Sequence, residues 1–300
     1  MSKEQQLNQI IDTKEIKKVL ENLTGYPFEL EIARRVAAHG YLVDPNYSFE
    51  DHDTGEAREL DFRAFDLVPI SMWKGEWVDC ILLGACKDNK NPYVFFTRKE
   101  LTYSKLSLQS DLPIAGCPLN IHSEGDDAPV SVEFYLRLHE ILHIATSDII
   151  SSQFCELVRH NGNKWKVQSK EIFKDIFVPL IKALSREIAQ ENDRCISDKD
   201  DDSPKYTIYY PMLVLKGRMF EYYVPPKGPA QLREAKHILV IRHYQSRSIK
   251  CQYAIDVIHE SYLDEYLELV EKETKKLANR IKRHKAVLVQ SLKKIAPLET

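Results

Sequence analysis

Apolar and polar positions alternate along this chain with two different periods, which predicts a mixture of helices and strands. Helical spacing of apolar residues predicts helices over 4–22, 28–40, 130–145, 169–192 and 260–292. Alternating or continuous apolar runs predict strands over 41–49, 57–67, 78–87, 93–97, 164–168, 206–223, 237–244 and 251–258. The run 78–87 is almost entirely apolar, so it is expected at the centre of the sheet. The predicted fold class is α/β.

Breaks in these patterns divide the chain into four segments. Residues 1–105 form a predicted α/β core, and 106–196 form a mainly helical extension that starts with a loop rich in Pro and Gly. Residues 197–204, which read SDKDDDSP, form a predicted acidic linker. Residues 205–300 supply three strands and a long basic helix. This last segment either completes the first sheet or forms a C-terminal α+β extension.

Composition places the chain among soluble globular proteins. It has 300 residues, of which 43% are hydrophobic and 29% charged. It has no apolar run near the roughly 20 residues of a membrane span, and its first residues lack the apolar core of a signal peptide. Six cysteines form no CxxC pair, which argues against a disulfide framework or a zinc knuckle. A reduced cytoplasmic protein with no membrane contact is expected.

Charge adds one local feature to this picture. The net charge is −3, so the chain as a whole has no basic footprint for nucleic acid. Residues 272–294, however, hold nine Lys and Arg against the single acid Glu273. We expect Lys276, Arg280 and Arg283 to contact phosphates from this helix. The alternative is an ordinary solvated helix face.

Candidate chemistry comes from Glu29, Asp61 and Lys87, which fall on a predicted helix and two predicted strands. Hydrolysis of a phosphodiester needs an activated water and neutralisation of the charge that develops in the transition state. Carboxylates that hold Mg²⁺ or Mn²⁺, with a lysine beside them, meet both needs. The sequence therefore suggests a metal-dependent nuclease core.

These residues lie in motifs that resemble the PD-(D/E)XK, or restriction-endonuclease-like, nuclease superfamily over residues 24–97. The motifs are Phe28–Glu29, RELD ending at Asp61, and Cys86–Lys87 followed by NPYVFF at 91–96. The resemblance implies that Glu29 and Asp61 bind the metal and that Lys87 is the catalytic lysine. It also implies a nucleic-acid substrate, with DNA favoured over RNA, and pairing of two chains as a homodimer.

Position 85 departs from the family pattern. The superfamily has a carboxylate two residues before the lysine, on the same strand face, and this chain has Ala85. Alanine cannot bind a metal. Three explanations follow. The acid was replaced on purpose by a Glu→Ala change, or another carboxylate, such as Glu31, Glu59 or one from the later half of the chain, takes its place. The third is a natural loss of catalysis, which leaves a non-catalytic nucleic-acid-binding or assembly module on a nuclease fold.

A second motif suggests different chemistry. His139, Glu140 and His143 read HExxH, which on a continuous helix places both imidazoles on one face to bind Zn²⁺. The longer pattern of the metzincins fails, because Thr146 and Ile149 replace its glycine and third histidine. A third ligand would have to come from further along, for example Glu156 or Glu171. A zinc peptidase is the remaining alternative, against ordinary helix histidines.

Overall fold

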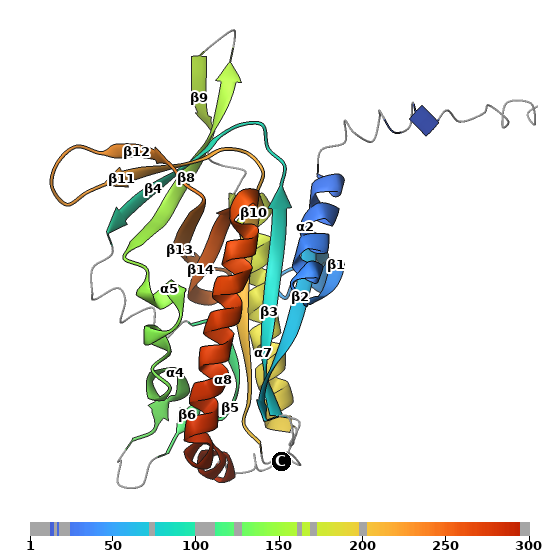
Figure 1. Cartoon of the computed structure of the whole chain (residues 1–300), viewed down its shortest axis with the longest axis vertical. Coiled ribbons are helices and arrows are strands. Elements are labelled where there is room, and N and C mark those ends of the chain that lie inside the picture. The colour runs from blue at the N-terminus through green and yellow to red at the C-terminus, as the bar shows by residue number, and fades with distance from the viewer. Residues whose placement is uncertain are drawn as a thin grey trace, which may run out of the picture.

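The computed structural model describes residues 13–14, 17, 25–71, 76–99, 112–122, 128–160, 164–168, 173–197 and 203–294. The predicted helix 4–22 therefore lies outside the described residues except at 13, 14 and 17. Most of the predicted linker 197–204 also lies outside them. The rest of the chain is built around one large sheet (Figure 1).

The sheet has 12 strands, and its main path runs β1-β2-β3-β10-β14-β13-β8-β4-β11-β12. Two further strands pair off this path, β5 with β10 and β9 with β8. The bounds are β1 Leu42–Glu50, β2 Ala57–Ser71, β3 Glu76–Lys87, β4 Tyr93–Lys99, β5 Ile114–Cys117, β8 Ile149–His160, β9 Lys164–Gln168, β10 Lys205–Leu215, β11 Met219–Val224, β12 Gln231–Glu234, β13 His237–Gln245 and β14 Lys250–His259. A small separate pair joins β6 Asn120–Ile121 to β7 Val130–Ser131.

Pairing directions change along the sheet. Strands β1, β2 and β3 form an antiparallel meander. Strand β10 then pairs parallel to β3, from Tyr206 opposite Val78 to Leu215 opposite Lys87, and β14 pairs parallel to β10. A parallel neighbour needs a crossover connection, and α7 lies between β3 and β10 in the chain. Strands from before residue 105, from 106–196 and from after 205 thus share one sheet.

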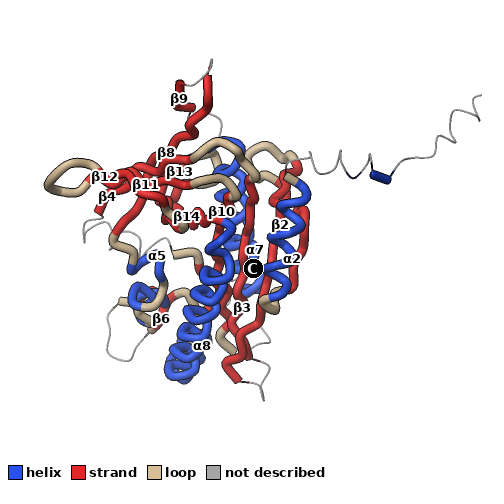
Figure 2. Tube along the Cα trace, turned by 45° about the horizontal axis from the view of Figure 1, so that its top comes forward, coloured by secondary structure: helices blue, strands red, loops and turns tan. Residues whose placement is uncertain are grey.

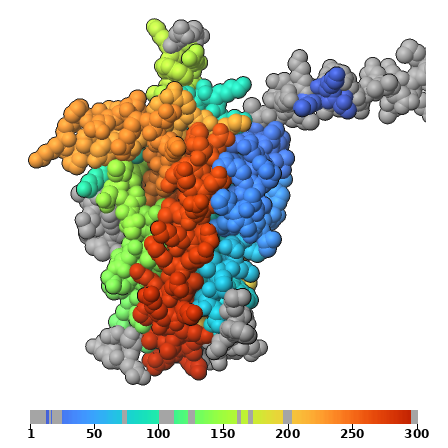
Figure 3. Space-filling model, in the orientation of Figure 1, coloured from blue at the N-terminus to red at the C-terminus, as the bar shows by residue number. Residues whose placement is uncertain are grey.

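Three long helices cover the two faces of the sheet: α2 Tyr26–Ala38, α7 Val178–Ser197 and α8 Leu263–Lys293. One hydrophobic core contains residues of α2 and α8, among them Phe28 and Tyr266. The other core contains residues of α7, among them Leu180 and Leu184. Helices α2 and α8 therefore pack on one face and α7 on the other, and α8 runs down the front in Figure 3.

Two strand hairpins extend from this layered body. All five residues of β9 are exposed, and so are the four residues of β12. Figures 1 and 2 show β9 rising above the sheet and the β11–β12 hairpin reaching out to one side. Among the described residues, no helix has the length and apolar character needed to cross a bilayer.

The predicted α/β class is confirmed, and several elements differ from the sequence prediction. The predicted helix 130–145 is wrong: it consists of short pieces, α4 Val132–Tyr135, a 3-10 turn η1 Leu138–Glu140 and α5 His143–Thr146. Arg137 has a positive φ of 52°, which no continuous helix allows. The predicted strand 206–223 is two strands, β10 and β11, separated by a turn at Gly217.

Other differences concern elements that the sequence pattern did not reveal. Strands β5 and β8 were not predicted, and both lie in the segment 106–196, which was expected to be mainly helical. The predicted helix 169–192 is described from residue 173, as a π-helical turn η2 Phe173–Phe177 that leads into α7. The last helix follows a 3-10 turn η3 Glu260–Tyr262.

Candidate functional site

Glu29 lies in the first turn of α2, the helix that packs on β1, β2 and β3. Phe28, Ile32 and Val36 form the buried stripe that holds the helix on the sheet, and Pro27 starts it. Glu29 is half-buried. Helix α2 therefore places this carboxylate near Asp61, which lies within β2, and Lys87, the last residue of β3, whose charges both act on it.

Asp61 lies where the ladder between β2 and β3 ends. The register that pairs Phe62 with Gly84 would, if continued by one residue, place Asp61 opposite Ala85. Instead, the Asp61 carboxylate accepts a hydrogen bond of 2.5 Å from the backbone N–H of Cys86. The Asp61 side chain thus takes the place of a backbone carbonyl as acceptor for the N–H of Cys86. Asp61 therefore has a structural role, the end of the ladder, as well as a candidate chemical one.

The structure brings the three predicted residues into one electrostatic cluster. Burial raises the pKa of Glu29, the negative charges of Asp61 and Glu59 raise it further, and Lys87 opposes the shift. Burial also raises the pKa of Asp61; the N–H of Cys86 and the charge of Lys87 lower it, and Glu59 raises it. Glu59 is thus a fourth member that lies on β2 and is exposed.

Ala85 occupies a different environment from the one that the resemblance implies for an acid at this position. Its methyl group is half-buried and packs against the core on the α7 face. Cys86 belongs to the core on the opposite face, which α2 and α8 cover. Glu59, rather than position 85, is therefore the extra carboxylate whose charge reaches both Glu29 and Asp61.

The HExxH motif does not form the helix that a zinc peptidase needs. His139 and Glu140 end the 3-10 turn, Leu142 is extended, and α5 starts only at His143. The His139 ring stacks beside Phe134, and its buried Nδ1 has no hydrogen-bond partner among the described residues. The prediction of a HExxH zinc site is therefore wrong, because the two imidazoles do not share a helix face.

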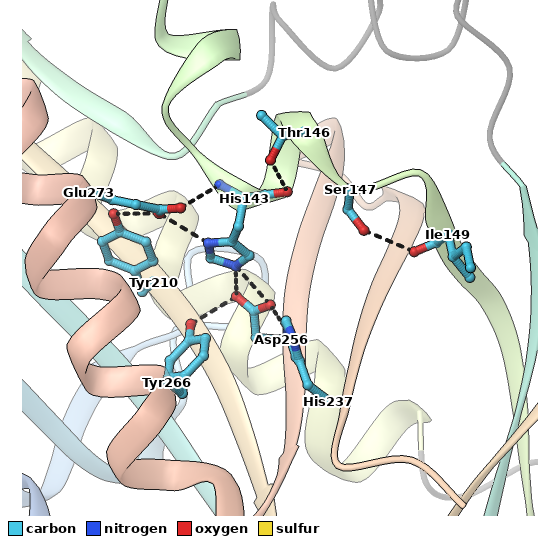
Figure 4. A network of polar contacts seen from close by, with 9 residues as sticks. All are labelled: His143, Thr146, Ser147, Ile149, Tyr210, His237, Asp256, Tyr266 and Glu273. Atoms are coloured by element: carbon cyan, nitrogen blue, oxygen red, sulfur yellow. Dashed lines mark hydrogen bonds and ion pairs between the residues drawn. The ribbon is translucent and has the colours of Figure 1, made fainter. Parts of the chain in front are cut away.

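His143 instead lies at the centre of a buried polar network (Figure 4). Its Nε2 lies 3.0 Å from each carboxylate oxygen of Asp256, on β14. Its Nδ1 lies 3.0 Å from Oε2 of Glu273, on α8. His237, on β13, places its Nε2 2.7 Å from Asp256 Oδ1. Strands and helices far apart in sequence thus bring two imidazoles and two carboxylates together.

Tyrosines and opposite charges complete this network. Tyr266 donates its hydroxyl to Asp256 at 2.8 Å, and Tyr210 donates to Glu273 at 3.2 Å. Burial alone would lower the pKa of His143, but Asp256 and Glu273 raise it to about 10. Burial would raise the pKa of Asp256, but His143 and His237 hold it below its usual range. Without a metal, the network holds an imidazolium between two carboxylates.

The predicted phosphate contacts on α8 divide into two kinds. Arg280 is committed to the protein, since it donates to the carbonyl groups of Leu136 and Arg137 and pairs with Glu140 at 2.9 Å. Lys276 and Arg283 are exposed. All three side chains line a surface hollow of about 420 Å³. Arg280 therefore holds the 130–145 segment against α8, and the phosphate contacts of the other two stay predictions.

Sequence reasoning missed His237, Asp256 and Glu273. They lie 94, 113 and 130 residues after His143 in the chain, so no local motif joins them. A signal was present, since Asp256 interrupts the apolar run AIDVI and Glu273 lies on the buried stripe of α8. Polar residues at core positions need partners, and these three are partners of one another or of His143.

Comparison of the chain with family models, curated proteins and solved structures found no match to any of them.

Proposed function

We propose that this protein is a metal-dependent nuclease-like protein that acts on phosphodiester bonds in nucleic acid. The observation that carries the proposal is that the charges of Asp61 and Lys87 both act on Glu29, and that of Lys87 on Asp61, where the β2–β3 ladder ends. Burial, and then neighbouring negative charge, disfavours the charged forms of Glu29 and Asp61, and a divalent cation between them relieves that cost.

The element order supports a restriction-endonuclease-like core. The chain order is helix α2, then the hairpin β1–β2, then strand β3, which is the order that the family resemblance implies. Strand β3 is flanked by β2 on one side and by β10 on the other, so it is central in this part of the sheet. Its last residue is Lys87.

Each side chain has a role in this proposal. Glu29 and Asp61 hold Mg²⁺ or Mn²⁺, and Glu59 supplies the further carboxylate that Ala85 cannot. The bound ion would activate a water and neutralise phosphate charge. Lys87 is exposed, so its ammonium group is free to orient the attacking water or to stabilise charge on the phosphate.

The proposed substrate is DNA, bound beside Glu29, Asp61 and Lys87 where the β2–β3 ladder ends. Lys276 and Arg283, exposed on α8, would contact its phosphates. Two chains paired as a homodimer would present one site to each strand of a duplex.

A cleavage assay tests the proposal. Supercoiled plasmid, linear duplex, single-stranded DNA and RNA are incubated with Mg²⁺ or Mn²⁺ and five proteins. These are the chain as it stands, Ala85→Glu, Glu59→Gln, Lys87→Ala and the control Glu56→Gln, which changes an exposed acid in the turn before β2. Lys87→Ala is expected to lower the cleavage rate at least about 100-fold, while the control leaves it unchanged.

The two acid variants identify the third carboxylate. If the unaltered chain cuts and Glu59→Gln does not, Glu59 has replaced the acid at 85. If only Ala85→Glu cuts, position 85 is the missing ligand. Cleavage that persists in Lys87→Ala contradicts the proposed site.

A non-catalytic nucleic-acid-binding module is the second candidate, and Ala85 is the observation that favours it. It predicts no cleavage by the unaltered chain and by Ala85→Glu, together with DNA binding that does not depend on added metal. Fluorescence anisotropy with a labelled duplex, with and without a chelator, measures that dependence. A variant with Lys276→Glu and Arg283→Glu should bind more weakly under both functions.

A further inference from the structure

We propose that His143, His237 and Asp256 form a binding site for a divalent transition-metal ion, separate from the acid–lysine cluster. One ligand atom from each of these residues lies within 4.8 Å of the other two. They come from three elements, α5, β13 and β14. Within the part of the chain that the structure describes, no other three His, Cys, Asp or Glu side chains have their ligand atoms this close together.

The donor set points to the class of ion. Two imidazole nitrogens and one carboxylate oxygen suit Zn²⁺ and related transition metals better than Mg²⁺, which prefers oxygen ligands and water. Three protein ligands leave a fourth tetrahedral position for water or another molecule. An ion with bonds of about 2.1 Å separates its ligands by about 3.4 Å. The nitrogen–oxygen distances of 3.0 Å and 2.7 Å need to open only slightly to admit it.

Outer groups already hold these ligands in orientation. Glu273 accepts from His143 twice, with its Oε2 3.0 Å from Nδ1 and its Oε1 2.6 Å from the backbone nitrogen. This leaves Nε2 facing Asp256 and His237 (Figure 4). A carboxylate on the far nitrogen of a histidine is the usual support of a metal ligand. Tyr266 similarly fixes the second oxygen of Asp256.

Charge and burial also favour an ion at this position. Asp256 is 1% exposed and Glu273 2%. Among the described residues, the ion pairs of both carboxylates involve histidine alone, with no lysine or arginine. Buried carboxylates need compensating charge. Without a metal the His143 imidazolium supplies it, and a bound divalent ion would supply it instead, with the Nε2 proton released to solvent. The His237 side chain, 24% exposed, marks the side from which solvent reaches the group.

The sheet register separates this group from the acid–lysine cluster. Asp256 pairs with Met212 on β10, and Met212 pairs with Gly84 on β3. Gly84 in turn pairs with Phe62, the neighbour of Asp61. Three strand spacings amount to about 14 Å, too far for one ion to contact both groups. The inference therefore does not rest on the proposed nuclease function.

Cobalt binding to the full chain tests this site. The purified protein is stripped with a chelator and titrated with Co²⁺, whose visible absorption reports nitrogen and oxygen ligands, and bound Zn²⁺ is measured in parallel by elemental analysis. The variants are His237→Gln and the matched control His243→Gln, which changes an exposed histidine on the same strand. Asp61→Asn is included to detect binding at the acid–lysine cluster.

The expected result is a visible absorption band that saturates at one ion per chain and persists in Asp61→Asn, with a dissociation constant weakened at least about 100-fold in His237→Gln and unchanged in His243→Gln. Zn²⁺ should also raise the melting temperature of the unaltered chain but not that of His237→Gln. Three results would overturn the site: less than one tenth of an equivalent bound, equal binding by His237→Gln, or loss of binding only in Asp61→Asn. Any of these leaves the network as hydrogen bonds alone.

Discussion

At the residue scale, the carboxyl groups of Asp51 and Asp79 have pKa values shifted in opposite directions by their surroundings. Asp51 lies in the turn after β1 and is 1% exposed, but Lys182 of α7 contacts both of its oxygens at 2.6–2.7 Å. Burial would raise its pKa, and the hydrogen bonds from Lys182 and Arg58 lower it to about 2. Asp79 on β3 has one buried oxygen with no hydrogen-bond partner among the described residues.

Asp79 is therefore expected to destabilise the fold at neutral pH. Burial, and then the charge of Glu191, raise its pKa to about 6. The folded state binds the proton more tightly than the unfolded state, so stability falls as pH rises from about 4 to about 6 and stays lower above that. Asp79→Asn should raise the free energy of unfolding at about pH 8 by about 1–2 kcal/mol, since partial contact with water weakens the penalty.

Urea unfolding at about pH 8 and about pH 4 measures this effect, because the difference between the two proteins should disappear at the lower pH. Asp44→Asn, which changes an exposed carboxylate on β1, is the matched control. An equal gain in both variants, or a gain that does not depend on pH, would contradict the assignment to Asp79.

At the scale of elements, β2 and β3 pack through a glycine and an aromatic ring. A Cβ atom at Gly84 would lie 2.0 Å from Cζ of Phe62, its partner in the ladder. Phe62 is fully buried against the core on the α2 and α8 face. The absence of a side chain at Gly84 thus makes room for this ring, just before the point where Asp61 ends the ladder.

Gly84→Ala should destabilise the protein by about 1–3 kcal/mol, because the added methyl group forces the Phe62 ring out of place. A double-mutant cycle with Phe62→Leu tests that cause. The smaller side chain should remove most of the penalty of Gly84→Ala, as measured by urea unfolding of the four proteins. Additive effects would show that the clash lies elsewhere.

At the scale of the whole molecule, one sheet joins the segments that the sequence divides. The predicted core 1–105 contains β3, whose ladder partner β10 comes from the segment after residue 205. Strand β4, also from the first segment, lies between β8 and β11 in the sheet. The segments therefore bury one another, which is the condition for a single cooperative unit.

A fragment of residues 1–105 should accordingly fail to fold alone. Its β3 would expose an apolar edge from Val78 to Lys87 that β10 covers in the full chain. Circular dichroism and gel filtration should show an unfolded or aggregated fragment, with recovery of a soluble complex on co-expression with residues 106–300. A soluble fragment with its own cooperative transition would instead establish an independent domain.

Local pattern was sufficient for elements whose residues interact mainly with sequence neighbours. The stripe Phe28, Ile32 and Val36 predicted α2, alternation predicted β2, and a nearly continuous apolar run predicted β3. The 130–145 segment has the same apolar content as a helix, but Arg280 of α8 binds two of its carbonyl groups, and Arg137 takes a positive φ. That tertiary contact cannot be read from the segment itself.

The candidate sites divide in the same way. The types and order of Glu29, Asp61 and Lys87 could be read from the sequence. The absence of an acid at position 85, which is Ala, could be read from it as well. Only the tertiary structure decided that Glu59 joins this cluster, and that His143 meets Asp256 and Glu273 rather than His139. The physical reason is that periodicity records which face of an element is buried, whereas strand order and helix placement decide which distant side chains meet there.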